Sequence, residues 1–181
     1  ISLDMSGPHL HERGYRLEHA GAPLRETLAA AILLRSGWDG REPLVDGMCG
    51  SGTFPIEAAM RARRIAPGAS RGFLFQLWPS FQKKSWEYLR RKALEMSIGR
   101  SPVPIIGIDA DSEAVGVSRG NAQRAGVDGD IDFRRMNFFD FDPHEHGLNE
   151  GLVVLNPPYG KRLGSGDSTL YNQVGAHLRR K

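Results

Sequence analysis

Short apolar runs that alternate with helical patterns constrain the fold of this chain more than any other feature. The apolar runs are Pro43 to Asp46, Val103 to Ile108, the segment around Ile131 and Phe133, and Leu152 to Leu155. Helical patterns are expected at 23–36, 55–63, 80–97, 112–126 and 168–180. Strands that alternate with helices predict a parallel α/β sheet joined by right-handed crossovers.

Local signals refine the expected helices. In the first, Leu24, Leu28 and Ile32 fall on one face. In the helix that begins near residue 112, the Ser112 hydroxyl is expected to cap the free amides, and Gly126 is expected to end the helix. Residues 69–79 are expected to be irregular.

The composition favours one cytoplasmic domain. The chain has 181 residues, of which 40% are hydrophobic and 25% charged, and one cysteine, so it forms no internal disulfide. No Cys/His cluster has zinc spacing, so no metal site is expected, and no apolar stretch approaches the roughly 20 residues that span a bilayer.

The net charge is +3, with basic clusters at 61–64, 90–92 and 179–181. Such clusters can contact phosphates, but they also fit the last turn or the solvated face of a helix.

A glycine-rich segment, DGMCGSGTF from Asp46 to Phe54, follows the first expected strand. Glycines in such a turn let a ligand lie against main-chain amides. A P-loop is excluded because no Gly-Lys-Ser/Thr is present. A dinucleotide site is disfavoured because the acid that ends the next strand, Asp109, follows an inserted helix. A tight turn without a ligand is the remaining alternative.

Polar residues end each expected strand, and ligands bind beyond these ends in open α/β sheets. Asp46 would repel a pyrophosphate but suits an ammonium group, and Asp109 can accept hydrogen bonds from ribose hydroxyls. Asn137 can bind an adenine amino group, with Asp140 as the second candidate and a turn residue as the alternative. An amino-acid head with a ribose describes S-adenosylmethionine.

The last expected strand ends at Asn156-Pro157-Pro158-Tyr159. Prolines cannot continue the strand, but a rigid ring fixes the direction of the Pro157 carbonyl. This carbonyl and the Asn156 side-chain oxygen can each accept one N–H of an exocyclic amine and direct its lone pair towards a methyl group. Tyr159 can stack on a flipped base, and Lys161 and Arg162 can hold phosphates.

The glycine-rich segment and the Asn-Pro-Pro-Tyr sequence resemble the S-adenosylmethionine-dependent amino-methyltransferases. LDMSGPHLHERGYR at 3–16, APLRETLAAAILL at 22–34 and LWPSF at 77–81 narrow the resemblance to bacterial THUMP-domain methyltransferases of 23S ribosomal RNA. That family modifies the N2 amine of a guanine, although its members are often labelled as N6-adenine DNA methylases. Asn137 departs from the aspartate of many relatives.

The resemblance implies a Rossmann-like class I methyltransferase fold whose last three strands have no counterpart here. It also implies a THUMP domain before residues 1–22, which would be a linker, and an incomplete methyltransferase domain at 23–181.

The candidate residues fall into three groups. Those for the cofactor are Asp46, Gly47, Met48, Cys49, Gly50, Ser51, Gly52, Thr53, Asp109, Ala110, Asn137, Phe138 and Asn156. Those for catalysis are Asn156, Pro157, Pro158 and Tyr159, and those for the substrate are Tyr159, Lys161 and Arg162. Cys49 is expected to be a packing residue rather than a nucleophile, since no histidine is placed to activate it.

The predicted function is therefore methyl transfer from S-adenosylmethionine to the N2 of a guanine in 23S ribosomal RNA. One alternative is a DNA methyltransferase that acts on adenine N6 or cytosine N4. Another is a nucleic-acid-binding module that keeps the cofactor fold without activity. An NAD-dependent oxidoreductase would need a hydride-transfer partner that the sequence does not suggest.

Overall fold

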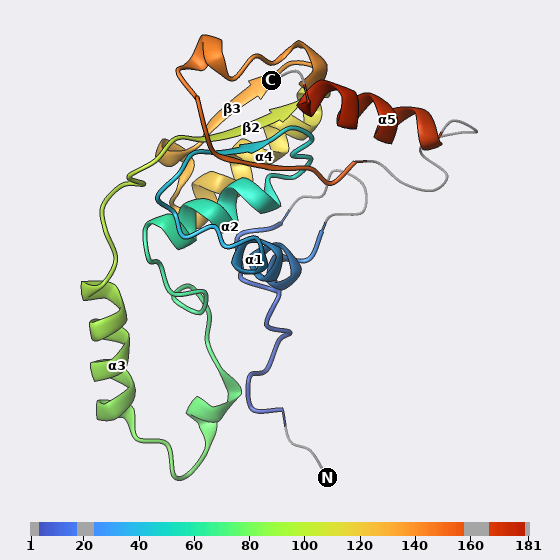
Figure 1. Ribbon diagram of the computed structural model, residues 1–181. Coiled ribbons are helices and arrows are strands. Elements are labelled where there is room, and N and C mark those ends of the chain that lie inside the picture. Colours follow the sequence, from blue (N-terminus) through green and yellow to red (C-terminus); the bar gives the residue numbers. More distant parts are fainter. Residues whose placement is uncertain (1–3, 18–23, 158–166, 180–181) are drawn as a thin grey trace.

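The sheet is parallel, as predicted (Figure 1). The computed structural model describes residues 4–17, 24–157 and 167–179. Its strands are β1 (Leu44–Asp46), β2 (Ile105–Asp109), β3 (Asp132–Arg135) and β4 (Leu152–Val154), in the order β3-β2-β1-β4. Chain order and spatial order differ, so β1 and β4 meet at a switch point, where α/β folds bind ligands.

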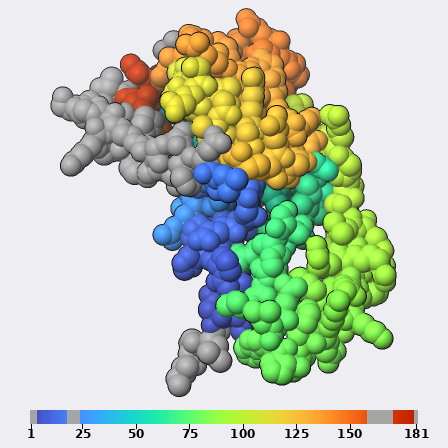
Figure 2. Space-filling model, turned by 180° about the vertical axis from the view of Figure 1, so that it is seen from behind, coloured from blue at the N-terminus to red at the C-terminus, as the bar shows by residue number. Residues whose placement is uncertain are grey.

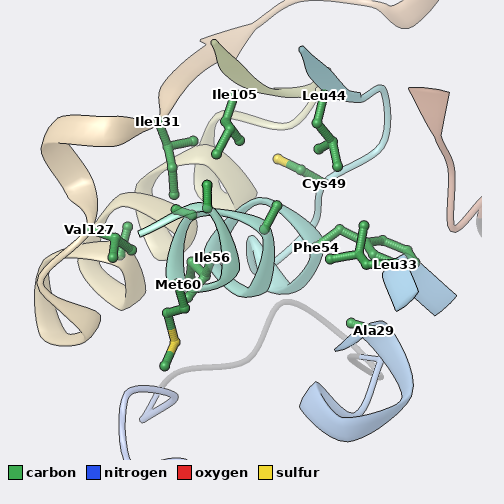
Figure 3. Packing of buried hydrophobic residues seen from close by; sticks show 14 of the residues in the cluster. Ala29, Leu33, Leu44, Cys49, Phe54, Ile56, Met60, Ile105, Val127 and Ile131 are labelled. Atoms are coloured by element: carbon green, nitrogen blue, oxygen red, sulfur yellow. The ribbon is translucent and has the colours of Figure 1, made fainter. Parts of the chain in front are cut away.

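Helices cover one face of this sheet. They are α1 (Glu26–Arg35), α2 (Thr53–Ala62) and α4 (Ser112–Ala125). Figure 3 shows α2 between the strand side chains Leu44 and Ile105 and the α1 residues Ala29 and Leu33, all of which are buried. This packing forms the main core. On the other face of the sheet, Val45, Ile106 and Ile108 form a smaller cluster with Phe141 and Leu148.

The strand register places the strand ends at different heights. Asp46 pairs with Gly107 of β2 and with Val154 of β4. Asp109 and Asn156 therefore lie two residues beyond Asp46, which is about 7 Å at the usual rise of a parallel strand. Asp46 is the deepest of the three residues.

Helix α1 packs through a different face from the one marked by Leu24, Leu28 and Ile32. Leu28 and Ile32 are 49% and 38% exposed, whereas Glu26, Ala29 and Leu33 are buried. The buried face accommodates Glu26 because its carboxylate lies 3.4 Å from the Arg16 guanidinium. An ion pair across ten sequence positions thus overrides the apolar pattern.

The N-cap of α4 also differs from the expectation. The Asp111 side chain, not Ser112, accepts the hydrogen bond from the Glu113 amide, and Ser112 is the first helical residue. Gly126 ends the helix with φ +69°, as predicted.

Helix α3 (Lys83–Glu95) belongs to an arm, residues 63–104, that stands away from the sheet (Figures 1 and 2). No residue of α3 is buried. The arm is ordered by its own aromatic contacts, in which Trp86 meets Phe73 and Phe75 edge to face at 5.7 and 5.1 Å. The segment expected to be irregular contains one 3-10 turn, Leu74–Leu77.

The remaining segments pack around these elements. The Arg71 guanidinium donates to backbone carbonyls of Ser6, Pro8 and His9, and so joins the arm to the N-terminal segment. Helix α5 (Asp167–Leu178) follows β4. The boundary expected at residue 22 stays a prediction. Across the described ranges, no helix is long and apolar enough to cross a membrane.

Candidate functional site

The glycine-rich segment connects β1 to α2 and is tied to the end of β2. The Cys49 amide donates to the Ile108 carbonyl at 2.8 Å, and the Gly50 amide donates to an Asp109 carboxylate oxygen at 2.9 Å. The Gly52 amide closes the turn onto the Cys49 carbonyl at 2.8 Å. These bonds hold the turn against the strand that carries Asp109.

Three glycines of this turn meet different demands. A Cβ on Gly47 would lie 2.2 Å from the ring of Phe138, and a Cβ on Gly52, at φ +81°, would lie 2.9 Å from the Cβ of Ser118. Close approach therefore requires both glycines. Gly50 has φ +53°, and no atom lies within 4 Å of its Cβ direction, so its backbone borders open space that a ligand can fill.

Asp46 lies at the base of the site and is 1% exposed. Its carboxylate accepts a hydrogen bond of 3.2 Å from the Met48 amide. Burial raises the pKa of Asp46 to about 8, helped by the nearby Asp109 charge, while the Met48 amide opposes the rise. The carboxylate lacks a cation among the described residues, so a positively charged ligand group would stabilise its ionised form.

Asp109 is half-buried at the rim of the site. Its two carboxylate oxygens accept bonds from the Gly50 and Asp111 amides at 2.9 and 3.0 Å. Each oxygen keeps a second lone pair, which leaves capacity for ribose hydroxyls. Ala110, which follows, is exposed.

Asn156 and Pro157 are half-buried just beyond β4, next to the end of β1. The Gly47 amide donates to the Val154 carbonyl at 3.3 Å, so the glycine-rich turn starts directly beside this strand end. The other residues predicted for catalysis and substrate, Pro158, Tyr159, Lys161 and Arg162, lie outside the described residues.

Asn137 follows β3 and is exposed. Its side-chain oxygen caps a 3-10 turn, Phe138–Asp140, by accepting from the Phe139 amide at 3.0 Å. Asn137 thus acts as a turn residue, which was the alternative expected from the sequence, and its contact with an adenine stays a prediction. Phe138 is buried over Gly47 and meets the ring of His177 from α5 at 5.0 Å, a neighbour that the sequence did not indicate.

The other residues of the turn are mainly structural in their contacts. Cys49 is buried in the main core, and burial raises the pKa of its thiol, so it packs as predicted rather than ionises. Ser51 and Thr53 are each 4% exposed. Their hydroxyls lie 3.5 Å apart.

Polar contacts around the buried Asn121 support the turn from behind, and sequence reasoning missed them. The Asn121 side chain donates to the Ser51 carbonyl at 3.0 Å and accepts from Arg124 at 2.6 Å. Arg124 also donates to the Tyr15 carbonyl. These bonds link the N-terminal segment to the glycine-rich turn. In the sequence, this link was indicated only by the position of Tyr15 within the segment 3–16 that resembles the family.

A second buried pair anchors the same segment to α2. Arg13 and the Tyr15 hydroxyl both donate to one Glu57 oxygen, at 2.8 and 3.0 Å. Burial raises the pKa of Glu57, although the bond from Arg13 opposes the rise. In the part of the chain covered by the structure, no group of three His, Cys, Asp or Glu residues could hold a metal ion.

A parallel sheet with a glycine-rich turn after β1 and acids at the ends of β1 and β2 defines a nucleotide-binding α/β domain. The comparisons make the class specific: the model of the RMKL-like methyltransferase domain matches residues 13–181. The chain belongs to this family.

Relatives with names support the assignment. Ribosomal RNA large subunit methyltransferase K/L of Vibrio parahaemolyticus is 42% identical over 185 residues, which cover 99% of this chain and 26% of that protein. The Synechocystis protein slr0064, classed with RNA methyltransferases, is 40% identical over all of this chain and 47% of its own length. The chain thus spans a quarter to half of these relatives.

Solved structures share the fold. SMU.472, classed as a methyltransferase and complexed with SAH, S-adenosylhomocysteine, superposes with a TM-score of 0.87 at 39% identity, over 98% of this chain and 46% of that one. A Listeria monocytogenes protein classed with N6-adenine-specific DNA methylases has a TM-score of 0.88 at 40% identity, with the same coverage. The Rossmann-like methyltransferase fold predicted from the sequence is confirmed.

Proposed function

We propose that this chain is the catalytic domain of a cytoplasmic enzyme that transfers a methyl group from S-adenosylmethionine to the N2 amine of a guanine in 23S ribosomal RNA. The observation that carries the proposal is the meeting of Asp46, Asp109 and Asn156 at adjacent strand ends beside an open glycine turn. The K/L methyltransferases of the ribosomal large subunit, which match the whole chain, support an RNA substrate.

The residues present fit this cofactor. Asp46 is a buried carboxylate without a cation, which suits the ammonium of the methionine part. Asp109 has lone pairs for the ribose hydroxyls, and the open backbone at Gly50 lets the nucleoside approach closely. The side chains of Asn137 and Phe138 border the same edge of the sheet and are our candidates for holding the adenine.

Asn156 and Pro157 perform the catalytic positioning in this proposal. Bound S-adenosylmethionine supplies an electrophilic methyl group. The Asn156 side-chain oxygen and the Pro157 carbonyl accept the two N–H groups of the guanine amine, which turns its lone pair towards that methyl group. Orientation of this kind can supply much of a rate enhancement, so no strong general base is needed.

The test is the Asn156→Ala variant of the full-length protein. We expect S-adenosylhomocysteine affinity, measured by calorimetry, to stay near that of the wild type, while transfer of labelled methyl to unmodified 23S RNA is abolished. The matched control is Asn137→Ala, which should weaken cofactor binding but retain turnover at saturating cofactor. Equal loss of binding and transfer in Asn156→Ala would show that its role is mistaken.

The product identifies the substrate. Nucleoside mass spectrometry should find N2-methylguanosine in RNA. N6-methyladenine in DNA would instead support the activity named for the Listeria protein. Cofactor binding without any turnover would support a non-catalytic module, and absence of S-adenosylhomocysteine binding would refute the proposal as a whole.

A further inference from the structure

The arm at 63–104 is far more basic than the rest of the chain. It contains nine Lys or Arg and two Asp or Glu, a net charge of +7. The whole chain has a net charge of +3, which leaves −4 for all other residues. The modest total charge therefore conceals a basic arm attached to an acidic domain.

The structure separates the basic residues of the arm into two kinds. Arg63 and Arg71 hold the arm in place: Arg63 pairs with Asp130 at 3.0 Å and donates to the Gly126 carbonyl, and Arg71 binds backbone carbonyls of the N-terminal segment. The basic residues of α3 are exposed instead. Their role is not to hold the arm.

The exposed side of α3 presents a compact surface of cations around one aromatic ring. Lys84, Tyr88, Arg91 and Lys92 follow the spacing of one helix face. The Arg91 guanidinium and the Lys92 ammonium lie 5.7 and 5.9 Å from the centre of the Tyr88 ring, which is 51% exposed. Glu87 and Glu95 are the acidic residues of the helix, and Glu95 pairs with both Arg91 and Lys92.

Aromatic contacts attach α3 to the rest of the arm. A helix of 13 residues is marginal by itself in water. The opposite side of α3 carries Trp86, which the rings of Phe73 and Phe75 hold, and so the helix is ordered although none of its residues is buried. Figure 2 shows the arm projecting beside the N-terminal segment.

We propose that the outer face of α3, formed by Lys84, Tyr88, Arg91 and Lys92, binds the sugar-phosphate backbone of the RNA substrate. The proposal rests on the proposed function for the identity of the RNA. Cations neutralise phosphates, and Tyr88 offers a ring on which a base can stack. The net charge of +7 on the arm attracts a polyanion more strongly than the rest of the chain does.

The test compares two double variants of the full-length protein. Lys84→Ala/Arg91→Ala removes two cations of the proposed surface, and alanine preserves the helix. Arg35→Ala/Arg41→Ala is the control, since these residues are exposed elsewhere and the charge change is identical. Binding of 23S RNA transcribed in vitro is measured by filter retention between 0.05 and 0.3 M salt, on the order of physiological ionic strength.

Loss of two phosphate contacts should reduce the slope of log K against log salt by about 1.5 and weaken binding about 20-fold at about 0.15 M salt. The control variant should keep the slope of the wild type and should change the affinity by no more than about twofold. Circular dichroism checks that α3 is retained. Unchanged RNA binding by the α3 variant would overturn the proposal. Binding of poly-L-glutamate is measured in the same way. If the variant lost affinity for poly-L-glutamate but not for RNA, the proposal would also be overturned, and the surface would be assigned to an acidic protein.

Two further readouts separate this proposal from the proposed function. Calorimetry with S-adenosylhomocysteine should give equal affinities for wild type and α3 variant, and the variant should raise KM for RNA without lowering kcat. RNA binding through α3 without methyl transfer by the wild type would refute the function and leave the surface intact. Normal methyl transfer by a protein whose RNA binding does not depend on α3 would support the function and refute the α3 surface.

Discussion

Asp46 gives the sharpest prediction about stability. Its pKa is raised to about 8 by burial, against 3.8 for an ordinary aspartate. Between these values the unfolded chain has lost the proton that the folded chain keeps. The contribution of Asp46 to the free energy of unfolding is therefore fully present below about pH 4. It is lost as the pH rises through about 8, at roughly 1.4 kcal/mol per pH unit.

Asn in place of Asp46 removes this dependence while keeping the hydrogen-bond acceptor for the Met48 amide. Between about pH 5.5 and 7.5, we expect wild type to lose about 2.5 kcal/mol relative to Asp46→Asn. Urea denaturation at a series of pH values measures the difference. Asp39→Asn, which alters an exposed carboxylate, is the control and should give a curve parallel to that of the wild type.

If the unfolding free energies of wild type and Asp46→Asn stayed parallel within about 0.5 kcal/mol over this range, the pKa of Asp46 would not be raised by its burial. The same variant should also bind S-adenosylhomocysteine more weakly, because it lacks the charge that would face the ammonium group. Gain of stability together with loss of affinity is the combined signature of a residue kept for binding rather than for folding.

Two other predictions concern the supports of the site. Gly52→Ala should destabilise the protein by about 2 to 4 kcal/mol, because the new Cβ would clash with Ser118 at a positive φ. Gly50→Ala has open space around the new Cβ and should cost only about 1 kcal/mol. Thermal unfolding measures both variants, and equal losses of stability would show that the contact with Ser118 does not matter. Glu57→Gln should cost about 3 to 5 kcal/mol, because the buried Arg13 loses its counter-charge. Urea denaturation checks it, and a loss below about 1 kcal/mol would show that Arg13 finds another partner.

The sequence predicted the elements well where each depends on local pattern. Strands and helices alternate as expected, and the acids at strand ends reach one edge because parallel strands share a direction. The Gly126 cap was also evident, since its conformation favours glycine. The elements and the cap depend on neighbours within a few residues, and the shared edge follows once the strands pair in parallel.

Features that depend on distant partners could not be predicted. The buried face of α1 follows from the pairing of Glu26 with Arg16, and the support of the glycine turn comes from Asn121, which is 70 positions from its partner Ser51. The closeness of Phe138 to Gly47 likewise joins two strand ends across the sheet. No periodicity in the chain encodes such pairs, so only the folded structure reveals them.

The strand register predicts different roles for the three residues of the proposed site. Asp46 lies two residues deeper than Asp109 and Asn156 and is 1% exposed, so its carboxylate is protonated in the free protein and would ionise when a positively charged ligand group lies near it. Asp109 and Asn156 lie at the rim and can touch a ligand directly. Substitution at Asn156 should therefore change binding or transfer with little effect on folding, whereas substitution at Asp109 also removes the acceptor of the Gly50 and Asp111 amides. Substitution at Asp46 should change folding stability and binding in opposite directions, and this contrast distinguishes a buried electrostatic role from direct contact.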